Sequence, residues 1–384
     1  NLDFIYNIKK KIFPFYKSND LNFVFKKLQE GFSKNNTTAM FVGGCVRKYL
    51  SNKKIDDIDI ATILTTDQIK EKFKNTKFNV VESGIKHGTV TLVSGNLKLE
   101  LTTLRKDIKT DGRHAEVEYI DDWKEDSNRR DFTINAIYLD NNGKIFDPQL
   151  GASDLKNHNV KFIGNAIKRI EEDYLRIIRF VRFSLEYECK AEQSVIKAIK
   201  LKINGIKKIS KERILTELFK ILHTKNFIKF NNDKQLAEIF LLIFPEFRYV
   251  ERLTKLNEIS KINNFNKEIL LATILLDETN NHEYFSHKYN ISNELKETLN
   301  LLAKNFINLK ENKKFFQQDL KKNIFFYGKE HLKALNIINF LAEKKIKHKD
   351  YLNILNIIEK ASISKFPFDE NYLKKNGIQE GVAI

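Results

Sequence analysis

The chain has 384 residues, of which 42% are hydrophobic, and its 67 basic and 50 acidic side chains give a formal charge of +17. This length allows about two to four modules with sizeable cores, and the composition excludes a disordered chain. The positive charge favours a polyanionic partner such as nucleic acid. The same abundance of Lys, Asn, Ile and Phe is typical of an AT-rich genome, so charge alone leaves the partner open.

Cysteine usage and hydropathy exclude further classes of protein. Cys45 and Cys189 are the two cysteines of the chain, too few for a disulfide framework or a cysteine zinc site, and they fit a reducing cytoplasm. The sequence has no run of about 18 uncharged apolar residues, so we expect no membrane span. It opens at Asn1 without a methionine, and we expect a trimmed N-terminus.

The pattern of hydrophobic and polar residues divides the chain into three regions. Residues 1–35 have helical periodicity, set by the apolar residues Leu21, Val24, Phe25 and Leu28. Short β-branched runs broken by Gly, Asn and Asp then predict a sheet from Met40 to Asp147. From Lys156 to the end the periodicity is helical. The sequence therefore predicts an α+β protein with a mixed head of about 150 residues and an all-helical remainder of about 230.

A strand, two glycines and a helix start are predicted within FVGGCVRKYL, residues 41–50. Gly43 and Gly44 would let the backbone approach a ligand and expose N–H groups near a helix N-terminus, where a phosphate can bind. A Gly-Gly turn is also common without any ligand. The segment therefore predicts a phosphate site only in combination with the acidic residues that come after it in the chain.

Acidic residues on the next two predicted strands suggest a metal site. Asp57 and Asp59 in DDIDIAT are two residues apart, so both carboxylates should point to one face while Asp56 points to the other. Two such oxygen ligands suit magnesium when nucleotide phosphates complete its shell. Glu100, on the polar face of KLELTTLR, could complete the site or act as base for an attacking hydroxyl. The alternatives are a solvated strand edge for the aspartates and an ordinary surface position for Glu100.

Five further segments occur in a distinctive order. They are GIKHGTVTLV (84–93), NRRDFTINAIYLD (128–140), FDPQLGASDLKN (146–157), RIEEDYLRIIRFVRF (169–183) and KERILTELFKIL (211–222). Together with the glycines and the acidic pair, this set resembles the class II tRNA nucleotidyltransferases and the related bacterial poly(A) polymerases, within the polymerase-β-like nucleotidyltransferase superfamily. The segment FDPQLGASDL lacks the doubled glycine often found in that family.

The resemblance implies both a fold and an activity. The fold would be a head with a small antiparallel sheet (1–147), a helical neck for nucleotide selection (148–222), and a helical body and tail for tRNA binding (223–384). The activity would be addition or repair of the 3′-terminal CCA of tRNA from CTP and ATP, in the cytoplasm, with the acceptor and TΨC arm gripped by its backbone. Two Mg²⁺ ions would be held by Asp57 and Asp59. The oligomeric state is left open.

The resemblance also assigns the nucleotide site residue by residue. Gly43, Gly44 and Arg47 would bind the triphosphate, and contacts to triphosphate and ribose would come from Arg129, Arg130, Asp131 and Asn135. Guanidinium forks match phosphate oxygens, and an asparagine can recognise a sugar hydroxyl. The alternative for Arg129 and Arg130 is a surface ion pair with Asp126 or Asp131.

Base selection is expected from Asp173 and Arg176, which the periodicity places at i and i+3 on one helix. In this family such a pair replaces a nucleic-acid template. An ionised aspartate can accept from the exocyclic amine of cytosine or adenine, whereas uracil and guanine would present a repelling carbonyl oxygen. Arg179 would support the nucleotide or the helix. The alternative is a salt-bridge set within the helix among Glu172, Asp173, Arg176 and Arg179.

A polar loop is predicted between Arg105 and Asp122, with Arg113 near its middle as a further nucleotide-binding residue. In the family a flexible loop here helps the site switch from CTP to ATP, so its presence favours complete CCA addition. The alternatives are a CC-adding or A-adding enzyme that works with a partner, and a poly(A) polymerase. From a different class, a non-catalytic RNA-binding protein stays open as well.

Overall fold

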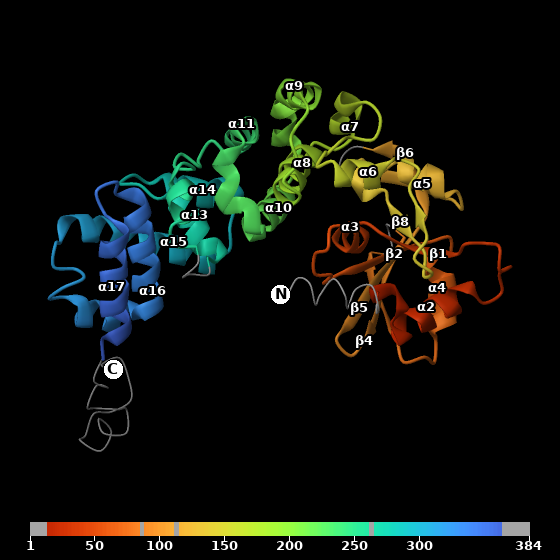
Figure 1. Cartoon of the computed structure of the whole chain (residues 1–384), viewed down its shortest axis with the longest axis horizontal. Helices are drawn as coiled ribbons and strands as arrows, with labels where there is room; N and C mark the ends of the chain where they lie inside the picture. The colour runs from red at the N-terminus through yellow and green to blue at the C-terminus, as the bar shows by residue number, and fades with distance from the viewer. Residues whose placement is uncertain (1–13, 85–87, 111–114, 261–264, 363–384) are drawn as a thin grey trace, which may run out of the picture. The chain divides into compact units, whose positions relative to one another are not determined.

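The structure of the protein is a computed structural model that describes residues 14–84, 88–110, 115–260 and 265–362 (Figure 1). Within these residues the chain forms two compact units. The first runs to Phe227 and includes Asp233–Phe244, and the second comprises Ile228–Asn232 and the chain from Pro245. The predicted head and neck thus belong to one unit, while the assignment of separate tasks to head, neck, body and tail stays a prediction.

A mixed sheet forms the centre of the head. Its strand order in the described residues is β3-β4-β5-β2-β1-β8-β9. All neighbouring strands are antiparallel except β2 and β5, which are parallel. The α+β class is confirmed, with a sheet larger than the small one expected. The strands are β1 (Ala39–Val42), β2 (Ile58–Thr62), β3 (Asn79–Gly84), β4 (Thr89–Ser94), β5 (Leu97–Thr103), β8 (Tyr138–Leu139) and β9 (Ile145–Phe146).

Short helices accompany this sheet. The predicted N-terminal helix is α2 (Asn19–Gln29), which begins where the Ser18 hydroxyl accepts a hydrogen bond from the Leu21 N–H at 3.3 Å. Its buried residues are the four apolar ones that set the predicted periodicity. The other helical elements of the head and its exit are η1 (Phe15–Lys17), α3 (Gly44–Leu50), α4 (Thr66–Phe73), α5 (Trp123–Asn128), η3 (Thr133–Asn135) and α6 (Gly151–Lys156).

The segment predicted as a loop from Arg105 is instead a two-stranded antiparallel ribbon of β6 (Arg105–Thr110) and β7 (Ala115–Tyr119). Lys106 of β6 lies opposite Glu118 of β7, and the two side chains pair at 2.9 Å. Such cross-strand pairs stabilise a ribbon, which is why a polar sequence pairs here. Arg113, between the two strands, lies outside the described residues.

The neck consists of α7 (Ala166–Glu172), α8 (Leu175–Glu186), α9 (Gln193–Lys202), η4 (Ile203–Lys208) and α10 (Lys211–His223), with η5 (Lys225–Asn232) and α11 (Lys234–Ile243) next along the chain. The single helix predicted through Asp173 and Arg176 is wrong. Asp173 is extended (φ −155°, ψ 105°), and its Oδ1 accepts from the Leu175 N–H at 3.1 Å. Aspartate commonly caps a helix in this way, so the chain ends α7 and starts α8 at this point.

The second unit is helical throughout its described residues. It contains α12 (Arg252–Leu256), α13 (Lys267–Leu275), α14 (Asn281–Tyr289), α15 (Asn293–Glu311), α16 (Leu320–Ala342) and α17 (His348–Lys360). Helices α16 and α17 pack side by side (Figure 1), and α16 is interrupted at Gly328, where φ is 80°. None of the described helices combines the length and hydropathy that a bilayer span requires.

Candidate active site

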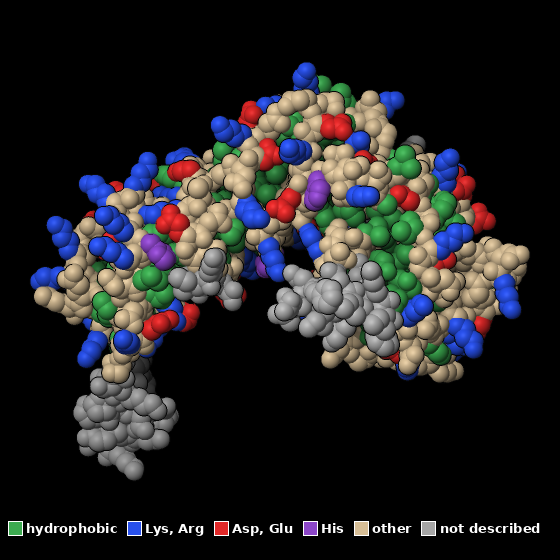
Figure 2. Space-filling model, viewed as in Figure 1, with side chains coloured by type: hydrophobic (Ala, Val, Ile, Leu, Met, Phe, Trp, Pro, Cys, Tyr) green, Lys and Arg blue, Asp and Glu red, His purple; other side chains and the backbone are tan. Residues whose placement is uncertain are grey.

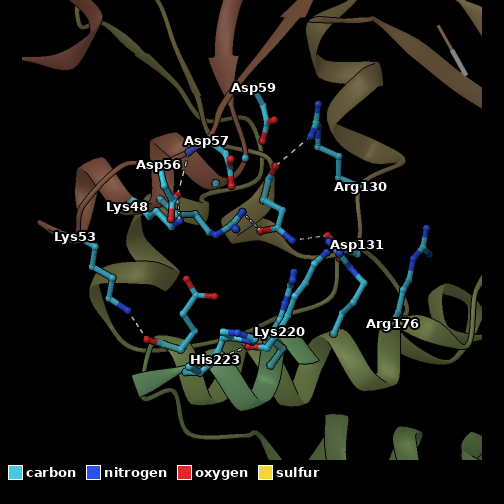
Figure 3. A pocket seen from close by; sticks show the side chains of 18 of the residues that line it. Lys48, Lys53, Asp56, Asp57, Asp59, Arg130, Asp131, Arg176, Lys220 and His223 are labelled. Atoms are coloured by element: carbon cyan, nitrogen blue, oxygen red, sulfur yellow. Dashed lines mark hydrogen bonds and ion pairs between the residues drawn. The ribbon is translucent and has the colours of Figure 1, made fainter. Parts of the chain in front are cut away.

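One cavity in the first unit collects the residues that the sequence singled out (Figure 3). Its volume of about 1390 Å³ exceeds the roughly 300–1,000 Å³ typical of a site for one small ligand, so there is room for two reactants. The predicted residues that line it are Gly43, Gly44, Arg47, Asp57, Asp59, Arg129, Arg130, Asp131, Asn135, Asp173, Arg176 and Arg179. Glu100 lines an adjoining pocket that shares Asp57 and Asp59.

The glycine turn brings main chain against a carboxylate. Gly43 has φ 72° and ψ −128° and immediately precedes α3, a conformation that favours glycine. A Cβ added at Gly43 would lie 3.4 Å from Asp59 Oδ2, and one at Gly44 would lie 3.9 Å from the same oxygen. The Gly44 N–H also donates to Asp59. The turn therefore keeps the entrance beside Asp59 clear of side chains.

Three carboxylates lie close together where the cavity meets the adjoining pocket. Asp59 lies on β2 and Asp57 just before it, and the parallel register places Asp59 directly opposite Glu100 of β5. Burial raises the pKa of Asp59, and the charge of Asp57 adds to this, against the opposing effect of Arg47. The pKa of Glu100 is also raised, first by partial burial of its carboxylate and then by the charges of Asp59 and Asp57. Like charges thus accumulate here without sufficient local compensation.

This donor set fits a hard divalent cation. Among the described residues no three acidic, histidine or cysteine side chains form a cluster that could hold a metal alone. Magnesium commonly takes only one or two carboxylates and completes its shell with water and substrate phosphates. The pair Asp57 and Asp59 meets that requirement, and a cation between them would favour the ionised form of Asp59 against the burial and the neighbouring charge that raise its pKa.

A buried carboxylate holds the arginines of the NRRDFTIN segment. The side chain of Asp126 is fully buried; it accepts from Arg129 Nε at 2.9 Å, from Arg130 Nη2 at 3.1 Å and from the Tyr138 hydroxyl at 2.7 Å. Burial would raise the pKa of Asp126, but Arg130 and Arg129 outweigh it and hold that pKa well below its usual range. The alternative ion pair with Asp126 is therefore present, buried rather than at the surface, and both arginines still line the cavity.

A second network joins the head to the neck. The Asn135 amide donates to Asp131 Oδ1 at 2.6 Å, its oxygen accepts from Arg47, and Arg179 Nε of α8 donates to Asp131 Oδ2 at 2.7 Å. Burial would raise the pKa of Asp131, but Arg179 and Asn135 lower it well below the usual range. The network therefore fixes both Arg47 and Arg179 at the cavity wall.

Asp173 and Arg176 both line the cavity but pair with other residues. Arg213 Nη2 of α10 donates to Asp173 Oδ2 at 2.7 Å, while Arg176 Nη1 donates to Glu172 Oε2 at 2.7 Å. Of the alternative salt-bridge set within one helix, the pair of Glu172 and Arg176 is present. Arg179 pairs outside the helix, with Asp131.

The cavity also contains residues that the sequence reasoning missed. Lys220 and His223 of α10 lie across from Asp57 and Asp59 (Figure 3), and further lining residues include Lys53, Arg105, Asp107 and Arg182. Arg182 had a visible signal: with Arg176 and Arg179 it forms a run at three-residue spacing, which keeps neighbouring side chains on one side of a helix. The signal for Lys220 was its place in the KERILTELFKIL segment.

Aspartates at the start of the central strand of a mixed sheet, a glycine turn beside them and arginines across one cavity are the arrangement expected of a nucleotidyltransferase. Comparisons with known proteins agree. Residues 39–161 match the family described as "Poly A polymerase head domain", and residues 190–249 match "Probable RNA and SrmB- binding site of polymerase A".

Similar proteins cover most of the chain. The CCA tRNA nucleotidyltransferase 1, mitochondrial, of Danio rerio is 31% identical over 375 residues, 93% of this chain and 83% of that protein. The CCA-adding enzyme of Staphylococcus haemolyticus is 34% identical, covering 83% and 77%. In fold the chain is similar to the Bacillus stearothermophilus CCA-adding enzyme in complex with CTP, with a TM-score of 0.70, 24% identity and coverage of 88% and 80%. The chain therefore belongs to the class II family of CCA-adding tRNA nucleotidyltransferases and poly(A) polymerases, as its motifs predicted.

Replacing Asp126 by Asn should destabilise the first unit by about 3–5 kcal/mol, because two partly buried guanidinium groups lose their counter-charge. The matched change Asp56→Asn removes an exposed carboxylate paired with Lys48 and should cost about 1 kcal/mol or less. Urea unfolding at neutral pH measures both. A loss below about 1 kcal/mol in the Asp126 variant would show that this carboxylate does not stabilise the head.

The same carboxylate predicts a pH dependence. Because the folded-state pKa of Asp126 is depressed, its stabilisation is present above the unfolded pKa of about 3.9 and declines as the pH falls below that value. The free energy of unfolding should therefore fall from about pH 5 towards about pH 2, and fall less steeply in the Asp126→Asn chain. Equal slopes in the two chains would contradict this assignment.

Proposed function

We propose that the protein adds the 3′-terminal CCA to tRNA from CTP and ATP by nucleotidyl transfer with release of pyrophosphate. The observation that carries the proposal is a cavity that has Asp57 and Asp59 at one end and guanidinium groups along its walls. That arrangement suits a reaction between a hydroxyl and a nucleoside triphosphate, in which positioning and charge neutralisation do most of the catalysis. Family membership and the names of the relatives support tRNA as the acceptor.

The proposed cofactor is a pair of Mg²⁺ ions. Asp57 and Asp59 would hold them, together with phosphate oxygens of the nucleotide. When bound, the ions would activate the 3′ hydroxyl and neutralise charge on the leaving pyrophosphate. Glu100 is proposed as base for that hydroxyl, and its raised pKa makes it a stronger base than an ordinary glutamate.

The triphosphate is proposed to lie between the glycine turn and the arginines. Gly43 and Gly44 offer main-chain N–H groups, and Arg47, Arg129, Arg130 and Arg179 offer planar donors that match phosphate oxygens. Asp131 and Asn135 have their carboxylate and amide engaged by Arg179 and Arg47, so their first task is to orient those two groups. To contact the ribose, the Asn135 amide would have to give up its hydrogen bond to Asp131 or the one from Arg47.

Base selection is proposed for Asp173, with Arg176 as its donor partner. Arg213 and the Leu175 N–H each hold one carboxylate oxygen of Asp173, so the group meets the base in one orientation. A fixed acceptor favours the amines of cytosine and adenine over the carbonyl oxygens of uracil and guanine. The break between α7 and α8 is therefore part of the proposed base-selection site, because it places the Asp173 carboxylate at the α8 N-terminus.

The RNA contacts are proposed for the second unit. Lysine and arginine side chains are spread over the face of this unit that Figure 2 shows, which suits contacts to the backbone of the acceptor and TΨC arm rather than to particular bases.

A cytoplasmic location stays a proposal. It rests on Cys45 and Cys189, which are buried and form no disulfide. Because one relative is named as a mitochondrial enzyme, cell fractionation is needed to test the location.

Poly(A) addition is the second candidate, because the matched head family carries that name. The test supplies magnesium and a tRNA transcript that lacks its last three nucleotides, with the four nucleotides singly and in combination. Two additions with CTP and a third only with ATP present support complete CCA addition. Arrest after CC or addition of A alone would indicate an enzyme that works with a partner, long ladders with ATP would indicate a poly(A) polymerase, and no extension would favour a non-catalytic RNA-binding protein.

In that assay Asp57→Ala or Asp59→Asn should lower the rate by at least about 100-fold, because each removes a proposed metal ligand. The melting temperature of the Asp59→Asn chain should hold or rise, since the pKa of Asp59 is raised and its charge therefore opposes folding at neutral pH. Glu71→Gln, at an exposed acidic residue of α4 that pairs with Lys74 at 3.9 Å, is the control and should stay within a few-fold of the parent chain. A chain that retains half its activity without Asp57 would overturn the metal assignment.

Replacing Asp173 by Asn should weaken discrimination between CTP and UTP, because the amide presents a donor where the carboxylate presents only acceptors. The ratio of kcat/KM for CTP to that for UTP should fall by at least about tenfold. Glu171→Gln, at an exposed acidic residue that pairs with Lys202, is the matched control and should leave the ratio unchanged. An unchanged ratio in the Asp173 variant, with rates merely reduced, would assign Asp173 a structural role instead.

A further inference from the structure

The aromatic ring of Tyr174 lies directly against the backbone of Gly205. A Cβ added at Gly205 would lie 1.9 Å from Tyr174 Cε1 and 2.0 Å from Cδ1, a closer approach than at any other glycine in the described part of the chain. Gly205 is buried within η4, and its φ is outside the left-handed region. Glycine is therefore needed here to leave space for the ring, not to allow an unusual backbone conformation.

Tyr174 occupies the break between α7 and α8 that presents Asp173. Asp173 is extended, whereas Tyr174 already has helical angles (φ −63°, ψ −17°). Asp173 Oδ1 accepts a hydrogen bond at 3.1 Å from the N–H of Leu175, the residue after Tyr174. The Tyr174 carbonyl accepts the first main-chain bond of α8, from the Ile177 N–H at 3.1 Å. The bond that orients the Asp173 carboxylate thus spans Tyr174, and a displacement of Tyr174 would reorient that carboxylate.

The contacts to the ring come from a different part of the chain. Gly205 and Lys208 both belong to η4, which packs against α8, and Lys208 Nζ lies 5.5 Å from the Tyr174 ring centroid. An ammonium group at this distance is attracted to an aromatic ring. Tyr174 is half-buried, and among the described residues the cavity is lined by Asp173 but not by Tyr174. The ring can therefore influence a nucleotide only through its neighbour Asp173.

We propose that Tyr174 and Gly205 are positioning residues for base selection, because the contact of the ring with the glycine fixes the main chain from which the Asp173 carboxylate projects. The inference rests on the proposed function, which assigns base selection to Asp173. The bond from Arg213 fixes one oxygen of that carboxylate, and the ring fixes the backbone that carries it. Without the ring contact the carboxylate would meet the base in more than one orientation and would discriminate less well.

The direct test compares kcat/KM for CTP with that for UTP on a tRNA transcript that lacks its last three nucleotides. Gly205→Ala should lower the ratio of CTP to UTP by at least about fivefold, because the added methyl group displaces the Tyr174 ring. Tyr174→Phe keeps the ring atoms that meet Gly205 and should leave the ratio within about twofold. Asn204→Ala, at the exposed neighbour of Gly205 in η4, is the matched control and should leave the ratio unchanged.

A double-mutant cycle tests whether Gly205 acts through the ring. Tyr174→Ala removes the ring and should lower the ratio by a similar factor. Adding Gly205→Ala to that chain should lower the ratio no further, because no ring is left to displace. Should Gly205→Ala fail to fold, Tyr174→Ala decides alone: a lowered ratio supports the inference, and an unchanged ratio overturns it.

An unchanged ratio in Gly205→Ala, with only a lower melting temperature or a smaller active fraction, would overturn the inference and leave Tyr174 as a packing residue. Additive losses in the double-mutant cycle would overturn it as well, because Gly205 would then act without the ring. Both outcomes leave the proposed function intact, since the parent chain would still extend tRNA with CTP in preference to UTP. A parent chain that extends no tRNA, or that uses UTP as readily as CTP, would instead overturn the proposed function itself.

Discussion

The buried bond between Asp131 and Arg179 is the contact on which the cavity depends. A carboxylate as buried as Asp131 needs a cationic partner, and it finds one on α8 of the neck at 2.7 Å. Its second oxygen accepts a hydrogen bond from the Asn135 amide, and the Asn135 oxygen in turn accepts one from Arg47 of α3. One carboxylate therefore ties the end of the NRRDFTIN segment to both sides of the cavity, and two of the proposed triphosphate ligands derive their positions from it.

The charges at the two sides of the cavity complement one another. At the sheet, Asp57, Asp59 and Glu100 lie close together, and burial, followed by the charge of the neighbouring carboxylates, raises the pKa of Asp59 and of Glu100. Across the cavity, the guanidinium groups of Arg47, Arg129, Arg130 and Arg179 line the wall. A divalent cation on one side and a polyphosphate on the other would neutralise both, and a metal-bound nucleotide supplies the two together. The protein thus keeps electrostatic repulsion in its folded state that substrate binding would release.

The sequence predicted those features that depend on local pattern. Residues close together in the chain determine the periodicity of α2, the strands of the sheet and the helices of the remainder. They also bring the glycine turn beside Asp57 and Asp59. The break at Asp173 could not be read from a period, because its capping bond and its bond to Arg213, 40 residues away, override helix propensity. The contact between Arg47 and the Phe183 ring of α8 was hidden for the same reason, since Arg47 comes from a distant segment of the chain. The β6–β7 ribbon was predicted as a loop because its polar sequence does not reveal which residues pair across the two strands.

The most direct measurement is a double-mutant cycle on Asp131 and Arg179. The rate constant kcat/KM for CTP addition would be compared among the parent chain, Asp131→Asn, Arg179→Gln and the combined variant. If one bond positions both sides of the cavity, the two substitutions should be strongly non-additive, with a coupling of about 1–3 kcal/mol. The exposed pair Lys200 and Glu238, at 2.7 Å, serves as the reference cycle and should give a coupling below about 1 kcal/mol. Additive losses at Asp131 and Arg179 would contradict the account, because the two residues would then act independently.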